Sequence, residues 1–177
     1  GFPTLARRRD LAANVHGAGL MGIKRVGSDE GTGGLESIAS HDGIVLVLGD
    51  PLTDQDGTFG ASAALYVYLG YHASEATRSA HFVLPVTTFA EQEGTFTNLD
   101  GRVQRFWPAL HAPGMARPAW LVVGALVAQL ADQPTPRSAA EAFAALSGAV
   151  SAFSGLGYDD IGARGAIVNQ VVSVTGD

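Results

Sequence analysis

Residues 80–104 read AHFVLPVTTFAEQEGTFTNLDGRVQ, a short apolar run followed by a polar segment that contains two glycines. The run over 81–84 is typical of a strand, and Pro85 ends it because proline has no N–H to give to a neighbouring strand. Gly94 and Gly101 permit backbone angles that are closed to other residues. The side chains between them are of the kinds that hydrogen-bond nearby backbone in turns. These are Thr95, Thr97, Asn98 and Asp100. We therefore expect a strand that leads into a structured loop.

Two further apolar runs precede this one. The segment 43–51 predicts a strand buried on both faces, because aliphatic residues without polar alternation are bounded by glycines. A second strand is predicted over 65–69. Short apolar strands separated by crossover-length segments predict an α/β fold, Rossmann-like, with a mostly parallel sheet flanked by helices.

Two helices are expected after the loop, and both are expected to cover the sheet. The first has its first turn at Pro118 and its body at 120–131. The second is predicted to begin at Thr135 and Pro136 as cap and first-turn proline. Its apolar stripe consists of Ala139, Phe143, Leu146 and Val150. The predicted organisation is a tail and glycine-rich linker over 1–40, an α/β domain over 41–150 and a C-terminal tail over 151–177.

Composition excludes several classes of function. A net charge of −6 lacks the basic surface that nucleic acid requires, so no nucleic-acid partner is expected. The absence of cysteine excludes disulfides, thiolate-bound zinc and iron–sulfur clusters from these 177 residues. The longest apolar run, 119–130, is shorter than the roughly 20 residues of a membrane helix, so no membrane insertion is expected. The chain does not begin with Met, and we expect it to be a piece of a longer protein.

Other motifs give little support for a site. Gly17, Gly19 and Gly22 match the dinucleotide fingerprint in spacing, but the strand and helix that it requires are not predicted around them. The glycine-rich loop 27–34 lacks the lysine of a phosphate loop. The five histidines have no metal-binding spacing, so no metal site is expected.

Two segments stand apart, 49–51 and 91–104, because both follow the ends of predicted parallel strands, where open α/β sheets bind ligands. The residues leave two interpretations open. In one, the segments bind a ligand. In the other, which the spacing favours, Asp50 caps a turn, Glu91 pairs with Arg102 and Asn98 holds the loop.

The run 80–104 resembles the signature of the molybdopterin oxidoreductase family, a strand ending in Leu-Pro and then Glu-x-x-Gly-Thr-x-x-Asn-x-x-Gly-Arg-x-Gln. The matching residues are Pro85, Glu91, Gly94, Thr95, Asn98, Gly101, Arg102 and Gln104. Further landmarks resemble one branch, the large iron–sulfur subunit of bacterial respiratory complex I, the NADH:quinone oxidoreductase. They are 14–18, 47–51, 75–80 and 113–120.

The resemblance implies a molybdopterin-oxidoreductase-like domain without catalytic residues or cofactor in this stretch, with iron–sulfur clusters in the rest of the parent subunit. The matching residues would then fold the loop, and a vestigial site would comprise Gly49, Asp50, Thr95 and Asn98. The alternative is the pterin-nucleotide-binding half of a molybdenum oxidoreductase, in which those four residues touch the nucleotide. Two departures weaken a working site: His81 stands where the family has Asp, and 69–72 lacks the usual acidic residue.

On this resemblance we expect a structural scaffold in the peripheral arm of complex I. Its partners would be the remainder of its own subunit and other peripheral-arm subunits, on the cytoplasmic face of the bacterial plasma membrane. Clusters elsewhere would carry electrons from NADH toward quinone. A free-standing interaction module is a third possibility.

Overall fold

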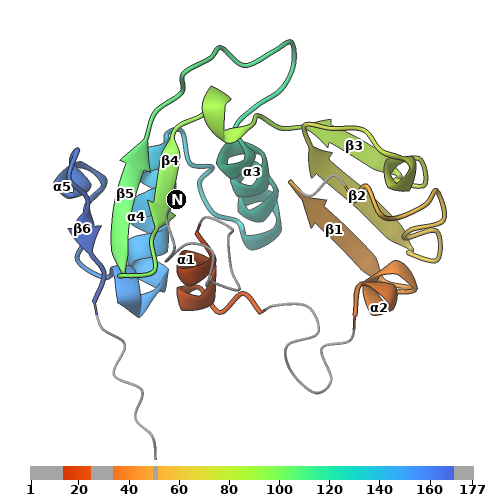
Figure 1. The fold of residues 1–177 in the computed structure, drawn as a ribbon, viewed down its shortest axis with the longest axis horizontal. Helices are drawn as coiled ribbons and strands as arrows, with labels where there is room; N and C mark the ends of the chain where they lie inside the picture. Colours follow the sequence, from red (N-terminus) through yellow and green to blue (C-terminus); the bar gives the residue numbers. More distant parts are fainter. Residues whose placement is uncertain (1–13, 25–33, 50–51, 170–177) are drawn as a thin grey trace, which may run out of the picture. The chain divides into compact units, whose positions relative to one another are not determined.

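The computed structural model describes residues 14–24, 34–49 and 52–169. They group into two compact units. Residues 25–93 and 107–136 form one, here called the parallel unit, and residues 1–24, 94–106 and 137–177 form the other, the antiparallel unit. The run 80–104 therefore contributes to both. The domain boundaries given above stay a prediction. Figure 1 labels the elements.

The parallel unit contains the predicted sheet. Its strands are β1 (Ile44–Leu48), β2 (Leu65–Gly70) and β3 (Phe82–Pro85), in the order β1-β2-β3, and both pairings are parallel. In register, Leu46 lies beside Val67, and Val67 lies beside Phe82. The 3₁₀ turn η1 (Glu75–Thr77) lies between β2 and β3. Helix α2 (Leu35–Ala39) precedes β1. The expectation of an α/β fold with parallel strands is confirmed.

The core of this unit lies on one face of the sheet. Tyr66 and Tyr68 are buried there with Val45, and Phe59 from the β1–β2 connection meets the Tyr66 ring edge-on at 5.7 Å.

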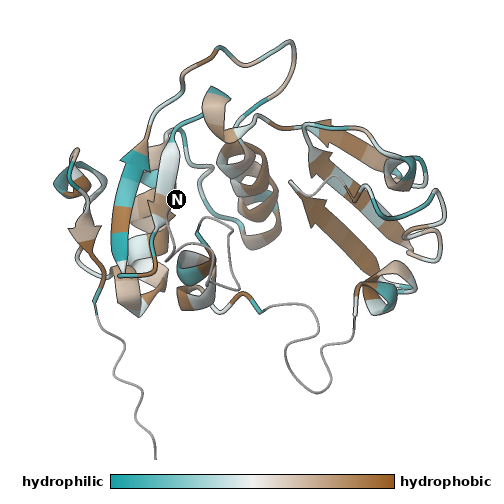
Figure 2. Cartoon of the chain, viewed as in Figure 1, coloured by the Kyte–Doolittle hydropathy of each residue, from teal (hydrophilic) through white to brown (hydrophobic). Residues whose placement is uncertain are grey.

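The expectation that 44–48 is buried on both faces is wrong for the described residues, because Ile44, Leu46 and Leu48 are 64%, 53% and 53% exposed. Ile38 and Ala39 of α2 pack against the core face. We call the opposite side the open face; its exposed members are Ile44, Leu46, Leu48, Phe82 and Leu84, whereas Leu69 between Leu48 and Leu84 is buried. Figure 2 shows the apolar character of β1.

Helix α3 (Ala119–Ala131) begins directly after Pro118, as predicted. Helix α4 (Ala139–Ala149) begins later than predicted, because Ser138 is its cap: the Ser138 hydroxyl accepts a hydrogen bond from Glu141 N–H at 3.1 Å. The expectation that α4 covers the parallel sheet is also wrong. It belongs to the antiparallel unit, where Phe143 packs edge-on against Phe153.

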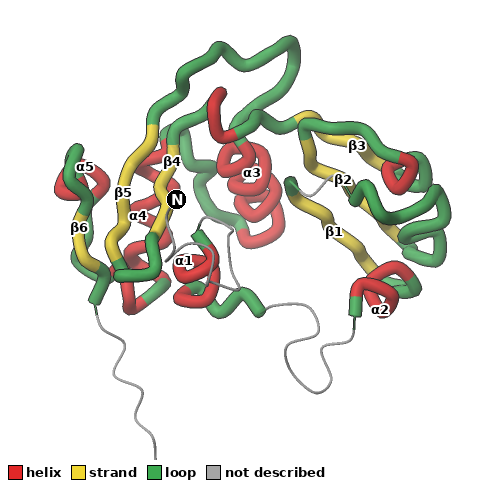
Figure 3. The backbone as a smooth tube through the Cα atoms, viewed as in Figure 1, coloured by secondary structure: helices red, strands yellow, loops and turns green. Residues whose placement is uncertain are grey.

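The antiparallel unit is built on a second sheet that the sequence reasoning did not predict. Its strands β4 (Gly94–Thr97), β5 (Arg102–Phe106) and β6 (Ala166–Ile167) pair in that order, all antiparallel. The segment 94–106, interpreted above as a loop, is thus a β-hairpin, drawn as two yellow strands in Figure 3. Residues 151–169, expected as a tail, contribute η3 (Ser151–Phe153), α5 (Tyr158–Ile161) and β6.

Helix α1 (Val15–Leu20) completes the antiparallel unit and contains the first two glycines of the Gly-x-Gly-x-x-Gly match. Gly17 is buried against Thr97 of β4, where a Cβ would lie 3.0 Å from the Thr97 Cβ. The glycine therefore permits helix–strand packing. No helix among the described residues is long and apolar enough to cross a membrane.

Candidate functional site

A cleft of 310 Å³ lies at the carboxyl ends of β2 and β3 in the parallel unit. Its walls are mostly apolar, with a few polar groups from His72, Thr88 and Glu91. Open α/β sheets bind ligands at this end of their strands, so this is the position at which a site is expected. Its lining includes Gly70, Tyr71, Val83, Pro85 and Met115.

The floor of the cleft is fixed by the end of β2. A Cβ at Gly70 would overlap the Tyr68 ring, so only glycine at this position leaves space for that ring. The Tyr68 hydroxyl then donates to the His72 carbonyl at 2.8 Å, which holds the chain as it leaves the strand. Val86 N–H donates to the Gly70 carbonyl at 3.1 Å, so the two strand ends stay joined beyond Pro85.

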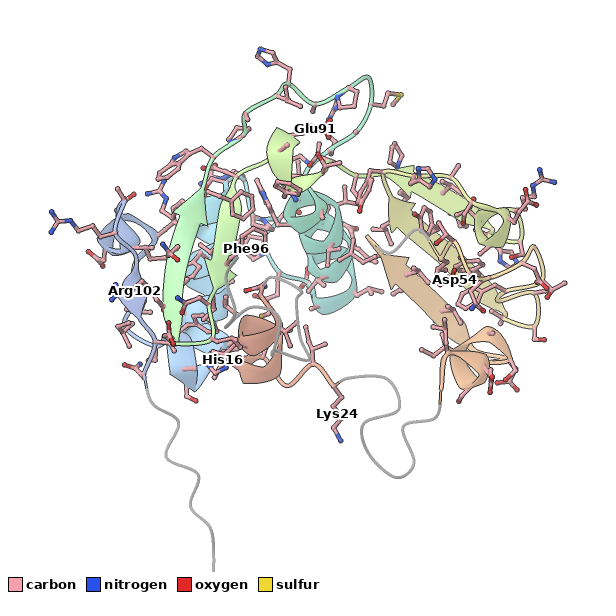
Figure 4. The ribbon with its side chains drawn as sticks, in the orientation of Figure 1. His16, Lys24, Asp54, Glu91, Phe96 and Arg102 are labelled. Carbon is pink, nitrogen blue, oxygen red and sulfur yellow. The ribbon has the colours of Figure 1, made fainter. Side chains whose placement is uncertain are left out.

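Glu91 lies at the cleft but its carboxylate has a structural task. It ends η2 (Phe89–Glu91) and accepts a hydrogen bond from Thr88 N–H at 2.9 Å, completing a capping box with Thr88. Figure 4 labels it at this turn. The pairing of Glu91 with Arg102 considered above stays a prediction, because the two residues belong to different units. Within the antiparallel unit, Arg102 donates to the carbonyls of Arg164 and Gly165 at 3.4 and 3.5 Å.

The hairpin turn between β4 and β5 is organised by Asn98. Its side-chain oxygen accepts from Asp100 N–H at 3.0 Å and from Arg102 N–H at 2.8 Å. Gly101 has a φ of +73°, which a residue with a Cβ adopts only at a cost. The Asn98 side chain and the Gly101 backbone angle together close the turn, so both serve its geometry.

The remaining signature residues of the hairpin are strand positions. Gly94 has no positive φ; a Cβ there would lie 2.8 Å from the Phe106 ring, so glycine permits a close approach. The Phe106 ring stacks on Phe96 with centroids 4.6 Å apart. Thr95 pairs with Arg105, and Gln104 is exposed opposite Phe96.

The candidate ligand residues are divided between the two units. Gly49 follows β1 with a φ of +79°, and its N–H donates to the Leu69 carbonyl at 2.9 Å. Asp50 lies outside the described residues. Thr95 and Asn98 belong to the antiparallel unit. That these four residues form one site stays a prediction.

A second hollow, of 510 Å³, lies beside α2 and the segment 54–62. It contains carboxylates of Glu36, Asp54 and Asp56. Hydrogen bonds from the Thr58 hydroxyl and then the Thr58 N–H lower the pKa of Asp56, so this carboxylate is already used in a local turn. No group of three or more possible metal ligands occurs among the residues that the structure describes.

Two side chains that the sequence reasoning missed position the signature. The Gln92 side-chain oxygen accepts from Ala119 N–H at 3.1 Å and from the Thr87 hydroxyl at 3.2 Å, so it fixes the start of α3. Asn14 accepts from Thr97 N–H at 2.7 Å and ties α1 to β4. No short-range pattern marks Gln92, because its partners lie on other segments. Asn14 is the first residue of the landmark 14–18, but nothing in the sequence indicates that it accepts a hydrogen bond from β4.

Comparison with known proteins supplies the wider context. A model of the family described as "Molybdopterin oxidoreductase" matches residues 11–129. The chain is similar to F420-dependent formate dehydrogenase 2 subunit alpha of Methanococcus maripaludis, at 33% identity over 59% of this chain and 16% of that protein. It is also similar to an NADH-quinone oxidoreductase subunit of Pseudomonas fluorescens, at 32% identity over 66% of this chain and 14% of that protein.

A third relative is the NADH-ubiquinone oxidoreductase 78 kDa subunit, mitochondrial, of Candida albicans, at 35% identity over 47% of this chain and 11% of that protein. The chain thus spans between 11% and 16% of the length of these three relatives.

Proposed function

The chain belongs to the molybdopterin oxidoreductase family, and we propose that it is a structural scaffold within the large iron–sulfur subunit of an NADH:quinone oxidoreductase. In this proposal, iron–sulfur clusters held elsewhere in the subunit carry the electrons. The 177 residues contain no cysteine and would hold none of these clusters. The partners would be the rest of the subunit and neighbouring subunits of the peripheral arm, at the cytoplasmic face of the membrane.

The observation that carries this proposal is that polar side chains of the signature form hydrogen bonds with the protein's own backbone. Asn98 accepts two backbone N–H groups, Glu91 accepts another and Arg102 donates to two carbonyls. A ligand that used the same atoms would have to displace these bonds, and leaving a partner unsatisfied is costly. The signature residues therefore serve the fold.

The open face of the parallel sheet also supports a scaffold. Ile44 and Phe82 are 64% and 59% exposed, and neighbouring residues on β1 and β3 extend the same apolar surface. Contiguous exposed apolar patches are typical of surfaces that pack against other protein. A unit that contributes such a surface fits a role within a larger assembly.

The described cleft does not fit a pterin dinucleotide by itself. Its titratable lining groups are Tyr68, Tyr71, His72 and Glu91, and a carboxylate repels the phosphates of such a molecule. Phosphates are usually bound by cationic side chains or by N–H groups at a helix start.

The scaffold proposal is tested in the intact complex. Asn98→Ala weakens the hairpin turn, and Gln104→Ala alters an exposed side chain beside it as the control. We expect Asn98→Ala to lower the yield of assembled complex, measured on native gels, with unchanged iron–sulfur electron paramagnetic resonance signals per assembled complex. Loss of those signals from complexes assembled in normal yield would overturn the scaffold role.

A second candidate is the pterin-nucleotide-binding half of a molybdenum oxidoreductase. It is favoured by the similarity to the formate dehydrogenase subunit. Molybdenum and pterin analysis of the intact parent protein separates the two proposals. One molybdenum per folded protein would establish the second, and absence of both metal and pterin from a fully loaded preparation would reject it.

A further inference from the structure

Tyr66 and His81 are joined twice at the beginning of the β2–β3 pair. His81 N–H donates to the Tyr66 carbonyl at 2.9 Å, as in a normal parallel ladder. The Tyr66 N–H, however, donates to a side-chain atom, Nδ1 of the His81 imidazole, at 3.0 Å. A ring nitrogen therefore takes the place of a backbone carbonyl at this point of the sheet.

The chain path explains why a side chain is needed. Residues 75–78 form η1 and its cap, and the ladder of β3 begins only at Phe82. Tyr66 is fully buried, so its N–H needs an acceptor from the protein. The His81 imidazole supplies that acceptor from the first residue before the strand.

We propose that the His81 imidazole is a pH-sensitive clasp of the parallel sheet, closed when Nδ1 is unprotonated and released when the imidazole becomes cationic. An imidazolium carries a hydrogen on both nitrogens and has no acceptor to offer the Tyr66 N–H. Rotating the ring by 180° presents a carbon instead. Protonation and this hydrogen bond exclude each other, so the stability that the bond contributes is present at higher pH and is lost as the pH falls.

The charged and titratable groups near His81 do not form ion pairs with its imidazole among the described residues. On the segment before β3, Glu75 and Arg78 pair with each other at 3.1 Å. On β2, the Tyr66 hydroxyl donates to the Ala76 carbonyl at 3.2 Å. Before β1, on the far side of β2, stand His41 and Asp42.

The clasp lies at the opposite end of β3 from the cleft. β3 continues from it to Val83 and Pro85, which line the cleft. Release of the bond to Nδ1 weakens the amino end of the strand pair, where the bond from His81 N–H to the Tyr66 carbonyl remains.

The test is hydrogen–deuterium exchange at single-residue resolution in the full protein, at about pH 8 and about pH 5.5, a range that spans histidine titration. Protection of each amide is corrected for its intrinsic exchange rate at each pH. Val86 N–H, which donates to the Gly70 carbonyl at the other end of the same strand pair, is the internal control. The matched variant is His81→Asn, whose Oδ1 occupies the place of Nδ1 and accepts at both pH values.

We expect protection of the Tyr66 amide to fall about tenfold between the two pH values, the factor that one lost hydrogen bond implies, with Val86 unchanged. His81→Asn should show no fall, and His81→Ala should show low protection at both values. Equal protection of Tyr66 at both pH values would overturn the proposal. A fall in His81→Asn as large as in the parent protein would also overturn it. The Asn comparison decides the matter even where His81→Ala does not fold.

Discussion

The two units use their residues differently. In the antiparallel unit, signature side chains such as Asn98 and Arg102 bond to the unit's own backbone. In the parallel unit, an apolar face and a cleft remain accessible, although few signature residues line them. The contrast teaches that the polar signature side chains of the hairpin fix a backbone geometry, whereas strand β3 of the same run contributes to the accessible surfaces of the parallel unit.

The largest expected effect tests where the stability of the parallel unit resides. Tyr66 is fully buried, so Tyr66→Ala should lower the free energy of unfolding by about 3–5 kcal/mol. Phe96→Ala, in the hairpin, should cost less because Phe96 is only half-buried. Urea unfolding of the purified protein measures both. Tyr66→Phe, which removes only the hydroxyl bond to Ala76, serves as the control, and equal losses for Tyr66→Ala and Phe96→Ala would contradict the contrast.

The second prediction concerns the backbone of the hairpin turn. Gly101→Ala places a Cβ at a φ of +73° and 3.2 Å from Val168, so we expect destabilisation of about 1–2 kcal/mol. Gly148→Ala is the matched control, because Gly148 lies in α4 with open space around its Cβ position. It should stabilise by about 0.5–1 kcal/mol. Thermal unfolding should therefore shift in opposite directions, and the same direction for both would refute the role given to the Gly101 backbone.

The parallel strands were predictable because their apolar runs are short, continuous and bounded by glycine or proline. Exposure of the open face was not, because β1 is apolar on both sides and periodicity does not reveal which side finds a partner. The hairpin was missed although Asp100 and Gly101 form a turn dipeptide, since the polar residues around it were interpreted as loop.

The candidate site shows the same limit. The sequence predicted that Glu91 and Asn98 lie in a structured segment. Both side chains form hydrogen bonds with backbone groups at most four residues away, and such local bonds can be expected from the residue types alone. Gln92 and Asn14 act over 27 and 83 residues, and such contacts depend on the folded topology. The start of α4 was misplaced because Pro136 suggested a first turn, whereas Ser138 provides the hydroxyl that caps the helix.

The third prediction separates the contribution of the Asn98 side chain to the turn from that of the neighbouring strand pairing. Asn98→Ala removes the acceptor for two backbone N–H groups, so it should destabilise by about 1 kcal/mol. Asn98→Asp keeps an oxygen at the same place and should recover most of the loss. Hydrogen exchange at Arg102 N–H reports the turn directly. Unchanged exchange in Asn98→Ala would show that Gly101 and the strand pairing hold the turn without the side chain.

The smallest expected effect is a pH dependence at the start of α4. The hydrogen bond from the Arg137 guanidinium, then that from its N–H, lowers the pKa of Glu141 below its ordinary value of 4.5. Because the folded pKa is the lower one, the stabilisation is present above pH 4.5 and is lost as the pH falls through the folded pKa. Glu141→Gln should therefore flatten the acid limb of the thermal unfolding profile slightly. The Arg137 and Glu141 side chains are 85% and 42% exposed, so salt should weaken the effect. An acid limb identical to that of the parent protein would exclude this contribution.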